Sequence, residues 1–259
     1  MNRLSKPDRT TVVPAVALAI AVFAAMPATA AEILVLSAGA AQSPLKVALP
    51  AFESRTGHKV DIGYAPAGEI ARRVGAGEVY DLLILPAENV EGYERQGKAV
   101  PGTRAPLGKV GIGVAVNERA PSPDIGTPEA FKQALLAAKS IVYIDPARGT
   151  SGKHFAGVLQ QLGIADVVNA KAQLGSGGYV VAPVGRGEIE LGVHQISEIL
   201  PVPGVKLVGP LPEALQKWTV YTAVAMPGAK SPEAARELVA FLTGAEARAL
   251  FAPKGFSAP

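Results

Sequence analysis

The sequence predicts an α/β protein of two lobes, each a mainly parallel sheet flanked by helices, with two crossover strands between the lobes. The first observation is that short apolar strands alternate with helical segments along the chain, a pattern typical of parallel sheets with helices on both faces. The second is length, because about 229 residues remain after a leader of 30, a size at which a chain often divides in two. The third is a pair of long apolar strand-like segments, 109–117 and 218–226, which could carry the chain between lobes.

Residues 1–30 predict a cleaved signal peptide. Arg3, Lys6 and Arg9 precede an apolar stretch that is too short to span a bilayer comfortably. Ala28, Thr29 and Ala30 form the small-x-small pattern of a cleavage site, so we expect cleavage after Ala30. A retained membrane anchor is the alternative interpretation. We therefore expect export to the periplasm.

Three strand-and-helix units are predicted in the first part of lobe I, residues 31–114. Each begins with an apolar strand, passes through small residues and continues with a helical pattern. The strand and helix segments pair in order as 32–40 with 42–57, 59–68 with 69–77, and 80–89 with 90–98.

Lobe II is predicted over residues 115–222. A strand and loop at 140–152 open a helix at 153–163, and a glycine-rich loop at 175–187 precedes a strand at 189–195.

The crossings between the lobes are predicted near 111–116 and 222–226. Residues 223–259 then return to lobe I, where Ser231 and Pro232 form a favourable helix start.

Composition excludes several classes of protein. Without cysteine there are no disulfides, thiol nucleophiles or cysteine metal sites. Loss of the leader lowers the formal net charge from +3 to +1, and no basic run with interleaved aromatic residues suggests nucleic acid. The histidines His58, His154 and His194 lack the spacing of a zinc site. Ser151 and His154 are close only in sequence, so we expect no catalytic set, no metal and no cofactor.

Four loops share one design, in which a strand ends, small residues follow and a helix begins. They are residues 37–43, 64–69, 145–152 and 175–179. Backbone N–H groups at helix N-termini attract anions, and such loops gather at the carboxyl ends of parallel strands. The four together predict a ligand cradle, although each alone could be an ordinary turn.

The order of these segments, closing with FLTGAEARALFAPKGF, resembles the molybdate-binding periplasmic proteins of ABC importers, or a divergent sister branch of them. The resemblance covers the whole mature chain. It implies a type II periplasmic binding fold, a two-lobed clamp that closes on its ligand and presents it to a membrane permease.

The resemblance also implies a set of ligand-binding positions. The two serines that hold the oxyanion in family members correspond to Ala40 and Ala67, and the family's tyrosine corresponds to Gln195. The backbone amides that the family uses in lobe II fall on Ser151 and Gly178.

Further residues near the inferred cleft are candidate ligand contacts. Thr150 lies in the same loop as Ser151, and Arg148, Tyr179 and His194 would suit a carboxylate or another organic anion. Because three family hydroxyls are missing, a selective tetrahedral-oxyanion site is disfavoured.

We therefore expect a monomeric periplasmic solute-binding protein without enzymatic activity, which binds a small anion between its lobes and partners an ABC permease in the inner membrane. The anion would be a molybdate-like oxyanion or a small carboxylate. The alternative is a sensory or accessory binding module of the same fold for an organic carboxylate, not coupled to molybdate uptake.

Overall fold

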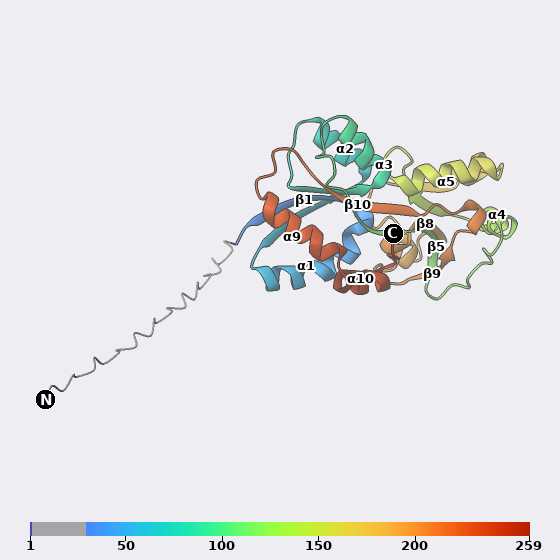
Figure 1. The fold of residues 1–259 in the computed structure, drawn as a ribbon. Coiled ribbons are helices and arrows are strands. Elements are labelled where there is room, and N and C mark those ends of the chain that lie inside the picture. Colours follow the sequence, from blue (N-terminus) through green and yellow to red (C-terminus); the bar gives the residue numbers. More distant parts are fainter. Residues whose placement is uncertain (2–29) are drawn as a thin grey trace.

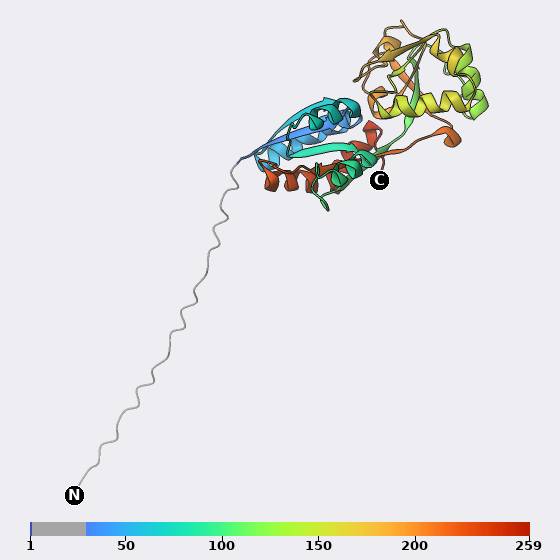
Figure 2. The same ribbon diagram turned by 90° about the horizontal axis from the view of Figure 1, so that it is seen from above.

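The computed structural model describes Met1 and residues 30–259, so the predicted signal peptide lies almost wholly outside the described residues. Two lobes, each built on its own sheet, are joined by two narrow segments of chain (Figures 1 and 2). Within the described part of the chain, no helix is long and apolar enough to cross a membrane.

The sheet of lobe I has the strand order β2-β1-β3-β10-β4. Its strands are β1 (Glu32–Ala38), β2 (Lys59–Ala65), β3 (Leu82–Pro86), β4 (Ala105–Val110) and β10 (Thr219–Ala225). β1 is parallel to β2 and β3, whereas β10 is antiparallel to β3 and β4. The late strand β10 therefore completes a sheet that the N-terminal part of the chain begins.

The sheet of lobe II has the order β7-β6-β8-β5-β9. Its strands are β5 (Ile112–Asn117), β6 (Ile141–Ile144), β7 (Ala172–Gly175), β8 (Leu191–Gln195) and β9 (Val205–Pro210). β6 is parallel to β7 and β8, and β5 is antiparallel to β8 and β9. The α/β fold class is confirmed, but both sheets are mixed, because each receives strands that arrive directly from the other lobe without a helical crossover.

Helices cover both sheets (Figure 1). In lobe I they are α1 (Gln42–Thr56), preceded by the 3-10 turn η1 (Gly39–Ala41), then α2 (Ala67–Gly75), α3 (Ala87–Arg95), α9 (Pro232–Thr243), α10 (Ala245–Phe251) and the 3-10 turn η3 (Ala252–Lys254). In lobe II they are α4 (Pro128–Ala137), α5 (Thr150–Gln161), α6 (Ala165–Asn169), α7 (Ala182–Gly185) and α8 (Ile196–Ile199), with the 3-10 turn η2 (Glu213–Leu215) before the return.

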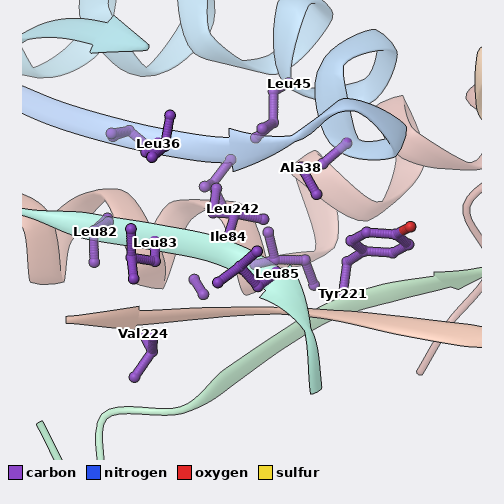
Figure 3. Packing of buried hydrophobic residues seen from close by; sticks show 14 of the residues in the cluster. Leu36, Ala38, Leu45, Leu82, Leu83, Ile84, Leu85, Tyr221, Val224 and Leu242 are labelled. Atoms are coloured by element: carbon purple, nitrogen blue, oxygen red, sulfur yellow. The ribbon is translucent and has the colours of Figure 1, made fainter. Parts of the chain in front are cut away.

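Helices bury the central strands on both faces. Every residue of β3 and of β8 is buried, as expected for strands covered on both sides. Figure 3 shows Leu36 of β1 and Leu85 of β3 in the core of lobe I, with Tyr221 of β10 at the edge and its hydroxyl pointing out of the cluster. The Tyr221 hydroxyl therefore points toward the space between the lobes.

The crossings between lobes are short. Gly111 alone separates β4 from β5, and the return runs through Gln216 and Trp218 just before β10. The Gln216 side chain ties the two crossings together, because its amide accepts from Ile112 N at 2.9 Å and donates to Ile112 O at 2.8 Å. The predicted return crossing at 222–226 instead falls on β10 and the residue after it, since an apolar pattern does not reveal where along a strand the lobe changes.

Candidate functional site

A small cavity of about 30 Å³ lies between the lobes, where strand ends and helix starts of both lobes meet. Lobe I contributes backbone and small side chains, and lobe II contributes most of the polar groups. Its lining residues are Ala38, Gly39, Ala40, Pro66, Ala67 and Tyr221 from lobe I, and Ile144, Gly149, Thr150, Ser151, Gly178, His194, Gln195 and Glu198 from lobe II.

Three helical segments begin at this cavity. They are η1 leading into α1, α2 starting at Ala67, and α5 starting at Thr150. The unpaired N–H groups and the positive dipole ends of helices favour a negative ligand. The first turn of α5 packs tightly against the end of β6, where a Cβ at Gly152 would lie 1.9 Å from the Ile144 carbonyl oxygen. Glycine at this position therefore lets the start of α5 reach the cavity.

The lobes touch each other around the cavity. Gly68 N of lobe I donates to Arg148 O of lobe II at 3.2 Å. A Cβ at Gly177 would lie 2.6 Å from the Pro66 ring, and a Cβ at Gly39 would lie 2.7 Å from Glu198 Oε1. The structure therefore shows a closed arrangement, and glycine is required where the two lobes approach most closely.

A buried chain of three polar side chains forms the lobe II wall. Ser151 Oγ lies 3.1 Å from His194 Nδ1, and His194 Nε2 lies 3.3 Å from Glu198 Oε2 and 3.1 Å from the Gly178 carbonyl oxygen. The exposed fractions of Ser151, His194 and Glu198 are 3%, 1% and 5%. These three side chains can therefore exchange a proton with one another in a site that excludes bulk water.

The protonation of His194 depends on its neighbours. Burial by itself lowers the pKa of His194, but the Glu198 carboxylate and the hydrogen bonds to Glu198 and Gly178 outweigh it, so the pKa lies above the ordinary value. The imidazolium form donates from Nε2 toward Glu198 and Gly178 and from Nδ1 toward Ser151. A positive charge on His194 thus offsets the buried carboxylate beside it.

Gln195 is the centre of a second cluster of polar side chains. Its Nε2 lies 3.4 Å from Tyr221 Oη and 3.5 Å from Thr150 Oγ1, and its buried Oε1 has no hydrogen-bond partner among the described residues. Burial, with the charge of Glu198 adding to it, raises the pKa of Tyr221, so the phenol stays neutral. An unpaired buried amide oxygen at the cavity wall is an acceptor that a hydroxyl or a protonated carboxyl group of a ligand could satisfy.

Seven of the nine residues predicted to bind ligand line the cavity: Ala40, Ala67, Thr150, Ser151, Gly178, His194 and Gln195. Arg148 and Tyr179 do not. Arg148 is exposed, and its Nε donates to Ser176 O at 2.9 Å. For Tyr179, burial and then the charge of Glu198 raise the pKa of the phenol. A role of any of the nine in ligand binding stays a prediction.

Two polar side chains of the lining, Glu198 and Tyr221, were not among the predicted site residues. The four-residue spacing of His194 and Glu198 could have indicated their pairing, but Glu198 has the sequence context of a solvated loop carboxylate. Tyr221 lies inside an apolar strand, and nothing in that pattern singles it out. No group of three or more metal-binding side chains occurs in the described part of the chain.

Comparison with known proteins places this geometry in context. Residues 33–257 match the family described as "Bacterial extracellular solute-binding protein". The chain is 34% identical to an aconitate isomerase of Pseudomonas sp over 244 residues, which cover 90% of this chain and 92% of that protein.

Solved structures share the fold. The periplasmic molybdate-binding protein of Azotobacter vinelandii superposes with a TM-score of 0.75 at 21% identity, covering 88% of this chain and all of that one. The substrate-binding domain of a molybdenum ABC transporter from Clostridium difficile gives a TM-score of 0.69 at 17% identity, covering 89% of this chain and all of that one. The predicted resemblance to molybdate-binding periplasmic proteins is thus confirmed.

The expectation of a protein without enzymatic activity is wrong, because a relative this similar over nearly its whole length is named as an isomerase. The expectation rested on residues close in sequence. His154, the neighbour of Ser151, instead bonds to the Leu215 carbonyl oxygen at 2.7 Å, and the partner of Ser151 is His194. On the match of 33–257 and the shared two-lobed fold, the chain belongs to the family of bacterial extracellular solute-binding proteins.

Proposed function

We propose that this protein is an isomerase of a small polycarboxylate such as aconitate, and that it moves a proton within the substrate while the substrate is enclosed between the lobes. The observation that carries the proposal is the buried chain Ser151–His194–Glu198 in the cavity wall. The name of the 34% identical relative supports the substrate class.

The cavity is poorly suited to a simple tetrahedral oxyanion. Ala40 and Ala67 offer no hydroxyl groups, so backbone N–H groups and the Tyr221 hydroxyl are the donors on the lobe I side. Glu198 is a buried carboxylate in the wall, and its repulsion of any bound anion is offset by the charge on His194 beside it. A His194–Glu198 pair is more useful for moving protons than for holding an oxyanion.

The chemistry needs one proton carrier. Aconitate is HOOC–CH2–C(COOH)=CH–COOH, so removal of a methylene proton leaves an anion delocalised over three carbons. Return of that proton to the other terminal carbon shifts the double bond and regenerates aconitate, with the opposite arrangement about the double bond now accessible. The atoms balance without an oxidant, a reductant or water.

Glu198 is the group best placed to carry that proton. Its Oε2 faces His194, while its Oε1 lies at the lobe I wall of the cavity against Gly39. The imidazolium of His194 and the N–H groups at the starts of η1, α2 and α5 would stabilise the negative charge that develops on the substrate carboxylates. Closure of the lobes removes water, which protects the carbanion from the solvent.

Substrate must enter through an opening motion. A cavity of about 30 Å³ is too small for aconitate, so the lobes must part to admit the substrate and must enclose it less tightly than in this structure. The two short crossings at Gly111 and Gln216–Trp218 are the segments about which the lobes would part.

The test is isomerisation of cis- and trans-aconitate by the purified mature protein, followed by proton NMR in D2O. We expect interconversion with little deuterium entering the methylene position, because one carboxylate carries the proton in a site closed to water. We expect Glu198→Gln to lower the rate at least about 100-fold, the lower range for general acid–base catalysis. Glu118→Gln, at an exposed position beyond β5, is the matched control. An inactive wild-type protein, or a Glu198→Gln variant as active as wild type, would refute the proposal.

A second candidate role, delivery of the bound anion to an ABC permease or to a sensor in the envelope, is supported by the hinged two-lobed architecture and by the family. Adjacent permease and ATPase genes would favour uptake, and their absence would favour a sensory role. Gel filtration would test the predicted monomer.

A further inference from the structure

A second, larger pocket, which is open to solvent, adjoins the first at Thr150, which lines both. This polar chamber has a volume of about 620 Å³ and lies between α3 of lobe I and α5 of lobe II, beside the return crossing. Its charged and polar lining includes Glu88 and Asn89 from the first turn of α3, Lys153 and His154 from α5, and Lys217 from the crossing. The chamber therefore extends the inner site outward between the same two lobes.

The polar chamber carries more positive than negative charge. Lys153 and Lys217 supply two ammonium groups, and Glu88 is the single acidic side chain lining it. Lys217 Nζ lies 3.4 Å from a Glu88 oxygen, whereas Lys153 forms no ion pair within the described residues. His154 already donates to the Leu215 carbonyl oxygen. Lys153 is thus the cation of the chamber left available to a ligand.

Two further observations concern the polar groups of the wall. The buried Oδ1 of Asn89 has no hydrogen-bond partner in the described part of the chain, and as an acceptor it could pair with a hydroxyl or a protonated carboxyl group of a ligand. Thr150 and Lys153 are three positions apart on α5, so they lie on one helical face, with Lys153 about 4.5 Å further along the helix from the inner cavity. The separation of adjacent carboxylates on a three-carbon skeleton is comparable with this distance between Thr150 and Lys153.

We propose that the polar chamber holds the distal carboxylate of a tricarboxylate whose reacting carbons lie in the inner cavity, and that Lys153 is the residue that selects tricarboxylates over dicarboxylates. This inference rests on the proposed function, because it takes the inner cavity as the place where the reaction occurs. The distal carboxylate touches α5 of lobe II and the first turn of α3 of lobe I, so it also favours closure of the lobes.

The test compares binding of propane-1,2,3-tricarboxylate, which has no double bond to isomerise, with binding of succinate by calorimetry. We expect Lys153→Met to weaken tricarboxylate binding at least about tenfold, or 1.4 kcal/mol, and to change succinate binding less than twofold. Glu88→Gln should strengthen tricarboxylate binding, because it removes the opposing charge and frees Lys217. The control is Lys230→Met, an exposed lysine that lines a different surface pocket beside His58 and Glu237.

Equal losses for both ligands in Lys153→Met, or no loss for either, would overturn the inference while leaving aconitate turnover by the wild type untouched. Selective loss of the tricarboxylate in a protein that does not isomerise aconitate would support the chamber and refute the proposed reaction. Failure of the wild type to bind either acid would overturn both.

Discussion

Gly39→Ala should hold the two lobes apart without damaging either one. Gly39 belongs to lobe I, and an ideal Cβ there would lie 2.7 Å from Glu198 Oε1 of lobe II. Contacts under 3.0 Å essentially never occur for real Cβ atoms, so Glu198 must shift or the lobes must stay further apart. The φ angle of Gly39 is not positive, so alanine is compatible with its backbone.

The cost of overpacking is about 1–3 kcal/mol for an added methyl group in a well-packed site. The lower end applies at Gly39, because the atom that must move is the end of the Glu198 side chain. Only the closed arrangement bears this cost, because the methyl group and the carboxylate come from different lobes. The closed state, and with it the affinity for any ligand that requires closure, should fall by about fivefold.

The assay is calorimetric titration with propane-1,2,3-tricarboxylate, together with small-angle scattering with and without ligand. Wild type should become more compact on binding, and Gly39→Ala should need far more ligand to do so. Gly92→Ala is the matched control, because a Cβ at Gly92, on α3, has no atom within 4 Å. That change should leave binding unaltered and stabilise lobe I slightly. Wild-type affinity in Gly39→Ala would refute the interpretation that the lobes close with Glu198 against Gly39.

The remaining predictions concern charge and ligand selectivity. The pKa of His194 is raised in the folded protein, so its charged form stabilises the fold fully below about pH 6.5, and this contribution is lost as the pH rises through the raised pKa. Carboxylate binding should weaken over the same pH interval. His194→Gln should abolish both pH dependences, as measured by calorimetry and thermal melts. The double variant Ala40→Ser with Ala67→Ser should bind molybdate up to about 100-fold more tightly than wild type, from two added hydrogen bonds of about 0.5–1.5 kcal/mol each. Unchanged molybdate binding would show that the pocket has a different shape from that of a tetrahedral-oxyanion receptor, and nanomolar binding by the unmodified protein would contradict the argument from the missing hydroxyls.

Much of the fold follows from local patterns. The strands and helices of lobe I occur in the predicted order, since apolar runs of strand length and helical repeats depend on near neighbours. The loops at 37–43 and 145–152 were predicted to form a ligand cradle because small residues follow strands there, and both reach the cavity. The direction of β10 was not predictable, because pairing with β3 and β4 joins residues more than 100 positions apart.

The sequence by itself determined the alternation of strands and helices, the small residues at the helix starts and the absence of serine at Ala40 and Ala67. Those properties depend on residue type and local spacing, which the chain carries wherever it folds. Only the tertiary structure decided which side chains act together. Ser151 and His194 are 43 positions apart, and they meet because β8 pairs with β6, the strand that leads into α5. Glu198 becomes a buried partner of His194 rather than a solvated carboxylate only because lobe I packs over it at Gly39.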